Sequence, residues 1–565
     1  MIKEDCGHGE AFVITLTPGG GTVSCPPGES LLNALAKAGV PAGGPCGGAG
    51  TCGKCKVAVF SGSSSPVTGS ERALLSGSEL AGHWRLACRT FPAGDLTVGF
   101  PRAESLNEKF PRDKKEDEKK DAPGRGFLSR AVSGRRAACG LAADIGTTTV
   151  DADLVDLETG AVLAERSAVN PQTRFGMDVL SRISRAMARP DSVGEMQRAI
   201  AGLLDAMTED LCRDARSEGG NIAEPSSIRT VAVAANCVML HLFLGVNPAP
   251  LGAFPFTPVF VRGRGLSAAD AGLKSVPRDA EVYCLPSASA FIGADIVAGV
   301  YVSELARRKG RVLFIDIGTN GEIVLSREGK LVSCSCAAGP ALEGMNISCG
   351  MRAAPGAVED VFIDGAAGTV RLKVVRDMPP AGICGSGVLA AIREMLRAGL
   401  LRADGSLTEK EELPPERRNL AALRDAGGGE NEGSAGAVRL AENVVVTQKD
   451  IRQVQLAKGA LLSGVRALLD HAGIGARDLD KVLVAGRFGE HLPAESLTEC
   501  GILPAGLGGK IEYLGNSSKA GARAALMSAR ARGEMETLAR GIEYLDLGAA
   551  PGYGDLFIQC LEFPD

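Results

Sequence analysis

Four cysteines near the start of the chain have the types and spacing of metal-cluster ligands. Five residues separate Cys46 from Cys52, two separate Cys52 from Cys55, and 32 separate Cys55 from Cys88. Four thiolates can bind an iron–sulfur cluster, two can form a redox-active pair, and cysteine pairs can hold zinc. Zinc ribbons use two short C-x2-C pairs, and this region has only one. The glycines that let the backbone wrap closely around such a cluster are Gly43, Gly44, Gly47, Gly48, Gly50 and Gly53.

The spacing favours a 2Fe-2S cluster over the zinc and thiol-pair alternatives. Plant-type 2Fe-2S ferredoxins use C-x4-C-x2-C and a distant fourth cysteine, and a five-residue first gap also occurs among such ferredoxins. Strand-like and helical runs surround the cysteines in the order typical of a β-grasp fold, including "WRLACRT" around Cys88. We therefore predict a β-grasp ferredoxin domain over residues 1–103 whose cluster carries one electron. Its metal ligands are Cys46, Cys52, Cys55 and Cys88.

A repeated segment predicts a second kind of chemistry further along the chain. "LAADIGTTTVDADLVDLETGAVL" begins at Leu141, and "LFIDIGTNGEIVLSREGKLV" begins at Leu313. Each reads as a strand, an Asp-Ile-Gly-Thr turn, a second strand, a charged turn and a third strand. Asp144 and Asp316 occupy the same place in the two copies, 172 residues apart. Two such hairpins predict two related lobes that face a cleft.

The hairpins resemble those with which actin-like ATPases hold nucleotide. A tight glycine turn brings backbone N–H groups and threonine hydroxyls to phosphates, and the aspartate holds a hydrated Mg²⁺. A later turn, "KVLVAGRFGEHL", is similar to the adenosine motif of acetate and sugar kinases, chaperone ATPases and actin. "GICGSGVLAAI" opens another helix, and the chain contains no P-loop motif. The residues predicted to hold ATP are Gly146, Thr147, Thr148, Gly318, Thr319, Asn320, Gly385, Gly387, Gly486, Phe488 and Gly489.

The composition and segment order are those of a multidomain α+β and α/β protein. The 565 residues, 45% of them hydrophobic, are enough for about three or four domains. Residues 104–137 are charged and poor in apolar side chains, which predicts a flexible linker. Residues 138–565 alternate apolar strands with helices, as expected of a two-lobed actin-like (ASKHA, ribonuclease H-like) ATPase region. We place the first lobe at 138–305 and the second lobe, with a C-terminal return helix, at 306–565.

The combination of a 2Fe-2S domain, a linker and an actin-like ATPase region resembles the reductive activators of corrinoid proteins. Further stretches fit that family, at 170–183, 236–248, 337–357, 450–461 and 514–526. The resemblance implies ATP-dependent one-electron reduction of an inactive Co(II) corrinoid on a partner protein, which restores Co(I) for methyl transfer. It also implies an upstream electron donor. The cobalamin-binding signature D-x-H-x-x-G is absent from the chain, so the partner is expected to carry the corrinoid.

Some positions depart from the pattern or admit two interpretations. Where a Gly-Asn-Thr-Thr turn is expected, the residues 235–238 are Ala-Asn-Cys-Val, which removes two hydroxyls. We interpret Asp144 and Asp316 as catalytic, and Glu343 either as the group that orients the hydrolytic water or as a structural carboxylate. Four later cysteines lack any C-x2-C pair and are expected to be buried thiols rather than ligands of a second cluster: Cys334, Cys336, Cys349 and Cys384.

Charge and hydropathy exclude several classes of protein. The net charge of −5 and the pI near 5.8 argue against a nucleic-acid or membrane-surface protein, which would need a basic face. No secretory signal and no apolar run of about 20 residues is present, so we expect a cytoplasmic protein. A homodimer is possible. The alternatives to the activator are a redox-gated kinase of a small metabolite and an ATP-driven regulator that remodels a partner and uses the cluster as a sensor.

Overall fold

The computed structural model describes residues 11–17, 21–38, 40, 50, 53, 55–99, 138–217, 223–422, 436–486, 489 and 492–564. Cys46, Cys52, Phe488 and the predicted linker 104–137 lie outside these residues. The chain divides into two compact units, Met1–Ala131 with Val169–Ile200, and Val132–Ala168 with Ala201–Asp565. No described helix is long and apolar enough to cross a membrane.

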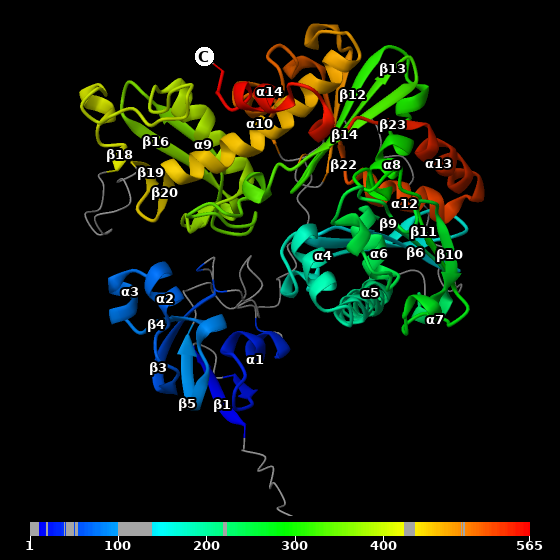
Figure 1. Ribbon diagram of the computed structural model, residues 1–565, viewed down its shortest axis with the longest axis horizontal. Coiled ribbons are helices and arrows are strands. Elements are labelled where there is room, and N and C mark those ends of the chain that lie inside the picture. Colours follow the sequence, from blue (N-terminus) through cyan, green and yellow to red (C-terminus); the bar gives the residue numbers. More distant parts are fainter. Residues whose placement is uncertain are drawn as a thin grey trace, which may run out of the picture. The chain divides into compact units, whose positions relative to one another are not determined.

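The N-terminal unit contains the predicted β-grasp fold, a five-stranded sheet in the order β2-β1-β5-β3-β4 with helix α1 beside it (Figure 1). Ser30 caps α1, as its Oγ accepts the backbone N–H of Asn33. The sheet and helix enclose a core that includes Ile14, Leu35 and Leu86. The elements are β1 (Phe12–Thr17), β2 (Thr22–Cys25), α1 (Leu31–Lys37), β3 (Lys56–Ser64), α2 (Gly69–Leu74), α3 (Gly77–Ala81), β4 (Trp84–Leu86) and β5 (Pro92–Gly99).

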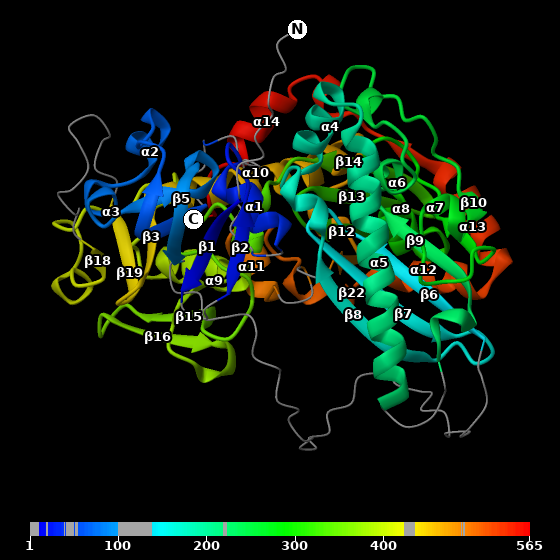
Figure 2. The same cartoon turned by 90° about the horizontal axis from the view of Figure 1, so that it is seen from below.

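The other unit is built around two six-stranded sheets with the same central arrangement. Their orders are β10-β11-β9-β6-β7-β8 and β22-β21-β12-β13-β14-β23. In each, a three-stranded antiparallel meander is followed on one side by a parallel strand, and Figure 2 shows β6, β7 and β8 as neighbours. The first sheet has β6 (Cys139–Ile145), β7 (Thr149–Asp156), β8 (Val162–Val169), β9 (Ile228–Ala235), β10 (Arg264–Ser267) and β11 (Glu281–Cys284). The second has β12 (Arg311–Ile317), β13 (Gly321–Arg327), β14 (Lys330–Cys336), β21 (Lys481–Ala485), β22 (Ile511–Gly515) and β23 (Ile542–Tyr544).

Strand register gives the two repeat aspartates equivalent positions. Asp144 pairs with Asp151 on β7 and with Ala234 on the parallel strand β9. Asp316 pairs with Glu322 on β13 and with Ala485 on the parallel strand β21. Because each aspartate lies one residue before the end of its strand, the turn after the strand and the turn after its parallel neighbour lie at the same edge of the sheet.

Helices and two small sheets complete this part of the chain. The chain leaves the second sheet at β22, packs α12 on α8 and on β6 and β9 of the first sheet, and returns through α13 to β23. The small sheets are β15 (Ala357–Asp364), β16 (Thr369–Val374) and β17 (Gly382–Ile383), and β18 (Ala421–Ala422), β19 (Ala437–Ala441) and β20 (Val444–Thr447). The helices of this unit are α6 (Cys237–Phe243), α7 (Ala268–Ala271), α8 (Ala294–Val302), α9 (Gly385–Arg397), α10 (Gln448–His471), α11 (Ala494–Glu499), α12 (Ser517–Met527), α13 (Ala529–Gly541) and α14 (Tyr553–Gln559). Helix α4 (Val179–Ala188) and the start of α5 (Ser192–Ser217) fall in the segment Val169–Ile200 that is grouped with the N-terminal unit.

Candidate functional site

The two described cluster cysteines lie close together in the N-terminal unit. Cys55 directly precedes β3, and Cys88 lies on the short 3-10 helix Ala87–Arg89. Their Sγ atoms are 3.3 Å apart, and both side chains are buried. The backbone N–H of Ala87 donates to the Cys55 carbonyl at 2.8 Å, which fixes the two segments to one another.

This geometry suits two ligands of one iron. Two sulfur atoms about 2.3 Å from a tetrahedral metal lie roughly 3.5–4 Å apart, close to the observed separation. Gly50 and Gly53 have φ of +73° and +65°, and such positive values let the loop backbone fold closely around a cluster. A Cβ on Gly50 would lie 2.1 Å from Nε of Arg89. The described part of the loop therefore fits a cluster, and Cys46 and Cys52 would supply the other two thiolates.

A buried ion pair supports the strand that leads to Cys88. The guanidinium of Arg85 donates to Glu71 through Nε at 2.8 Å and Nη2 at 3.1 Å, and the backbone N–H of Leu86 donates to the same carboxylate at 3.1 Å. Burial alone would raise the pKa of Glu71, but these donors and those of Thr68 outweigh it and hold the pKa below its usual value.

Glu71→Gln is expected to destabilise the ferredoxin domain by about 3–5 kcal/mol, because it leaves the Arg85 charge buried without its partner. The measurement is denaturant unfolding of the full chain, monitored by the absorbance of the cluster. Glu79→Gln is the matched control: it removes the partly exposed ion pair with Lys56, for which the expected cost is below about 1 kcal/mol. Equal losses in the two variants would contradict the special role of the buried pair.

The first hairpin presents Asp144 to donors from the far end of the chain. Ser518 Oγ donates to Asp144 Oδ1 at 2.9 Å, and Asn516 Nδ2 donates to Oδ2 at 3.0 Å. The turn after Asp144 is tight, since a Cβ on Gly146 would lie 2.6 Å from the Thr149 carbonyl. Both residues lie in the stretch 514–526 that fits the family resemblance, but nothing in the sequence links them to Asp144.

The turn that departs from the expected Gly-Asn-Thr-Thr pattern still contacts this hairpin. Asn236 Nδ2 donates to Oγ1 of Thr147 at 3.0 Å, and Asn236 Oδ1 accepts the backbone N–H of Met239 as the N-cap of α6. The asparagine thus orients one of the predicted phosphate-contacting hydroxyls. The replacement of the two threonines by Cys237 and Val238 leaves this contact intact.

The second hairpin places Asp316 and Glu343 in the same group. Thr319 Oγ1 donates to Glu343 Oε1 at 2.7 Å, and the side chain of Asn320 hydrogen-bonds Glu322. Gly486, with φ of +89°, lies so close that a Cβ would be 2.5 Å from Asp316 Oδ1. The turn after β21 therefore contacts the aspartate of the neighbouring strand, and Gly489 follows with its backbone close to Val484.

The two glycines before α9 have different surroundings. The backbone N of Gly385 would lie 3.4 Å from a Cβ on Gly344, the residue after Glu343. Gly385 thus adjoins the glutamate turn. Gly387 instead packs against β15, where a Cβ would lie 2.1 Å from the Val358 carbonyl. The close packing of α9 on β15 explains why position 387 is a glycine.

Two further carboxylates, Asp295 and Glu322, lie with Asp144, Asp316 and Glu343 and were not predicted from the sequence. These five side chains form the carboxylate cluster. Asp295 lies in the first turn of α8, and Glu322 faces Asp316 across the hairpin. Burial and then the neighbouring carboxylates raise the pKa of Asp144, Asp295 and Asp316 to about 7. The same causes, in the same order, raise the pKa of Glu322, and burial raises that of Glu343.

These carboxylates fit a magnesium–nucleotide complex better than a metal held by protein alone. Among the described residues, no three His, Cys, Asp or Glu side chains are placed to hold a metal ion together. Mg²⁺ bound to ATP takes one or two carboxylates and completes its shell with phosphate oxygens and water. A group of mutually repelling carboxylates is also one that a divalent cation stabilises.

Of the four later cysteines predicted to be buried thiols, three are buried in the second half of this unit, whereas Cys349 is partly exposed, with its Sγ 3.6 Å from the Asn443 carbonyl. Cys334, Cys336 and Cys384 are buried, and their Sγ atoms lie beside the carbonyls of Gly464, Gly321 and Val358. Burial raises the pKa of Cys334 and Cys336, which keeps both thiols protonated. They are not positioned as metal ligands in the described structure.

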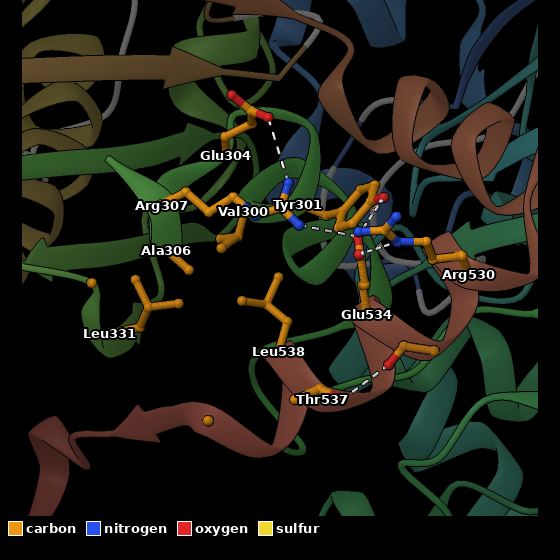
Figure 3. A pocket seen from close by; sticks show the side chains of 13 residues that line it. Val300, Tyr301, Glu304, Ala306, Arg307, Leu331, Arg530, Glu534, Thr537 and Leu538 are labelled. Carbon is orange, nitrogen blue, oxygen red and sulfur yellow. Dashed lines mark hydrogen bonds and ion pairs between the residues drawn. The ribbon is translucent and has the colours of Figure 1, made fainter. Parts of the chain in front are cut away.

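A separate pocket of about 590 Å³ lies between α8, α13 and the turn that joins β13 to β14. None of the residues predicted to hold ATP lines it. Figure 3 shows that its charged side chains pair with one another, since Glu534 contacts Arg307, Arg530 and the hydroxyl of Tyr301. Its other wall is apolar, with Leu331 and Leu538. This pocket is distinct from the carboxylate cluster.

Comparison with known proteins finds three family models that match successive parts of the chain. Residues 14–93 match the 2Fe-2S iron-sulfur cluster binding domain, 139–308 the RACo middle region, and 311–565 the "C-terminal domain of RACo the ASKHA domain".

Two curated relatives match most of the chain. The corrinoid activation enzyme RamQ of Eubacterium limosum is 32% identical over 75% of this chain and 70% of its own. The [Co(II) methylated amine-specific corrinoid protein] reductase of Methanosarcina barkeri is 25% identical over 75% and 77%. The solved structure of a reductive activator for corrinoid, iron-sulfur protein is 30% identical, covers 98% of both chains and has a TM-score of 0.67. The chain therefore belongs to the family of reductive activators of corrinoid proteins.

Proposed function

We propose that this protein transfers one electron from its 2Fe-2S cluster to the Co(II) corrinoid of a partner protein, with ATP hydrolysis, and so regenerates Co(I). The observation that carries the proposal is that one chain joins a match to the 2Fe-2S cluster binding domain and a match to the ASKHA domain, and is similar to a solved reductive activator over 98% of both chains. A 2Fe-2S cluster supplies one electron at a time, at potentials near −400 mV in plant-type ferredoxins.

At the electron-transfer site, the protein's part is to hold the cluster and limit water around it. Cys55 and Cys88 would bind one iron from rigid segments, and Cys46 and Cys52 would bind the other. The Arg85–Glu71 pair keeps the strand before Cys88 in place. An upstream electron donor must reduce the cluster again after each transfer, because the cluster gives up its only available electron.

At the nucleotide site, Asp144 and Asp316 would hold Mg²⁺ through its water shell, while the two glycine turns and Thr147 and Thr319 contact the phosphates. Glu343 would orient the water that attacks the γ-phosphate, giving ADP and phosphate. Its hydrogen bond from Thr319 fixes the carboxylate beside Gly318, where the second hairpin turns. Gly486 and Gly489 would form the turn under the adenosine, next to Asp316.

ATP is needed because the electron moves uphill. Each roughly 59 mV of unfavourable potential lowers the yield of Co(I) tenfold for a one-electron step. Nucleotide can shift that balance only by binding the states of the activator–partner complex with different affinities. The two sheets that carry Asp144 and Asp316 are suited to this, since a nucleotide between them would favour one relative position of the two sheets.

The test combines the reduced protein with a corrinoid protein held as Co(II), with and without Mg-ATP. The probes are the methylated-amine-specific corrinoid protein and the corrinoid iron–sulfur protein, and the readout is the Co(I) absorption band. We expect Co(I) to form with ATP and to form far less without it. Absence of Co(I) in every mixture, or a phosphorylated small product, would overturn the proposal in favour of the regulator or the kinase.

The proposed domain limits are 1–103, 104–137, 138–305 and 306–565, as the sequence predicts. An upstream electron donor, a homodimer and a cytoplasmic location stay predictions.

A further inference from the structure

We propose that Asn516 and Ser518 are positioning residues for ATP hydrolysis, which hold Asp144 from the segment that crosses between the two sheets. This inference rests on the proposed function, because it deepens the role of the same nucleotide site. Neither residue belongs to the two hairpins or to the glycine turns from which the site was predicted.

The contacts engage both oxygens of the Asp144 carboxylate. Ser518 Oγ donates to Oδ1 at 2.9 Å, and Asn516 Nδ2 donates to Oδ2 at 3.0 Å. Two donors on different oxygens fix the rotation of the carboxylate about its Cβ–Cγ bond. Asn516 Nδ2 also lies 3.4 Å from Asp151 Oδ2, the residue opposite Asp144 on β7.

The donors are themselves held rigidly. Asn516 is the N-cap of α12, and its Oδ1 accepts the backbone N–H of Lys519 at 2.8 Å. That bond leaves Nδ2 as the atom that faces Asp144. Ser518 is buried in the first turn of the same helix. Behind it, Gly521 packs so tightly on α8 that a Cβ would lie 2.4 Å from Cβ of Ala298.

The two donors lie where the chain passes from the second sheet to the first. Strand β22 belongs to the second sheet and ends at Gly515, whereas α12 begins at Ser517 and packs on β6 and β9 of the first sheet (Figure 1). Gly515 has φ of +64°, which a turn of the chain at this point requires. The neighbouring strand β21 leads to Gly486, which contacts Asp316.

One continuous stretch, residues 481–527, therefore touches both repeat aspartates, at Gly486 and at the start of α12. A change in the relative position of the two sheets must be absorbed where the chain crosses between them, and the crossing at Gly515 lies directly beside the two donors. We expect their hold on Asp144 to depend on that position, so that the metal-binding aspartate is aligned only when the sheets are placed for hydrolysis.

A purely structural role predicts a different result, and the helix offers a control for it. Lys519 pairs with Asp153 at 2.7 Å and with Glu165 at 3.0 Å, and so anchors α12 to the same hairpin without contacting Asp144. Lys519→Met should lower the melting temperature and leave the kcat for ATP hydrolysis within about twofold. It separates loss of helix anchoring from loss of aspartate positioning.

The test uses the full-length holoprotein and Mg-ATP, with ATP hydrolysis, the Mg²⁺ concentration for half-maximal rate, and binding of a fluorescent ADP analogue as readouts. Ser518→Ala should lower kcat by roughly tenfold to a hundredfold and raise the Mg²⁺ requirement, with a smaller change in nucleotide affinity. Ser518→Thr keeps a hydroxyl at this position and should therefore retain most of the rate that Ser518→Ala loses. Asn516→Asp keeps the helix cap but puts a carboxylate beside Asp144, so its loss should be larger.

Each outcome decides the question. If Ser518→Ala and Asn516→Asp hydrolyse ATP as fast as the unmodified protein, or if Lys519→Met loses as much kcat as they do, the positioning role is wrong. Failure of Ser518→Thr to recover the Mg²⁺ requirement would also contradict it. If the unmodified protein hydrolyses no ATP with or without its corrinoid partner, the proposed function itself is wrong. If only the variants behave otherwise than expected, the positioning role is wrong and the proposed function stands.

Discussion

The Cys88→Ser protein is expected to form no detectable Co(I) on a Co(II) corrinoid partner, with or without ATP. Serine replaces one of four thiolates with a poorer ligand for iron, and Cys88 lies 3.3 Å from Cys55, which would share its metal. ATP hydrolysis should persist, because the carboxylate cluster is built from residues of the other compact unit. Cluster absorbance, ATP turnover and the Co(I) band are measured on the same preparation.

Cys25→Ser is the matched control for this prediction. Cys25 is a fully buried cysteine of the same domain, and its Sγ lies near the carbonyls of Pro26 and Glu29 rather than near Cys55 and Cys88. The control variant should keep its cluster and its electron transfer. Retained Co(I) formation in Cys88→Ser, with the cluster spectrum unchanged, would show that Cys88 is not a ligand.

The second large effect is expected from Asp316→Asn, which should lower ATP hydrolysis by roughly 10²-fold or more and leave the cluster spectrum unchanged. The amide keeps the size of the side chain but removes the charge that would hold the hydrated Mg²⁺. The substitution removes the repulsion between Asp316 and the neighbouring Asp295 and Glu322, so the melting temperature without nucleotide should not fall. A loss of activity without a loss of stability is the expected signature.

An exposed aspartate elsewhere in the same unit provides the comparison. Asp364 lies at the end of β15 and accepts the backbone N–H groups of Ala366 and Ala367 in the following turn. Asp364→Asn should leave ATP hydrolysis and the Mg²⁺ requirement unchanged. Normal turnover in Asp316→Asn would remove Asp316 from the catalytic group, whereas a large fall in its melting temperature would show a structural role instead.

The repeated hairpins show how far local sequence can predict the site. The Asp-Ile-Gly-Thr turn is a local structure, since strand alternation and a tight glycine turn follow from neighbouring residues alone. Asp144 and Asp316 could therefore be paired by their place in the repeat, and the structure gives them equivalent registers. The cysteine spacing is equally local for three of the four proposed ligands, which lie within ten residues of one another.

Other members of the site depend on packing between distant segments. Asp295 enters from the first turn of α8, where nothing in its neighbours marks it as more than one helix carboxylate. Glu322 could have been suspected, because it lies opposite Asp316 in the same hairpin, but an alternating strand carries many polar residues. Asn236 retains a contact with Thr147 although its turn lacks the expected hydroxyls, and only the distance between the two side chains shows this.

The sequence by itself was enough to predict two chemistries, a four-thiolate cluster site and a paired-aspartate nucleotide site, because each rests on a short motif whose local geometry neighbouring residues impose. Only the tertiary structure decided what holds those aspartates. Asn516 lies 372 residues after Asp144, and it reaches the carboxylate because the chain leaves the second sheet at β22 and packs α12 on the first. Contacts over such separations arise from the burial of helix and sheet faces against one another, which no local pattern specifies.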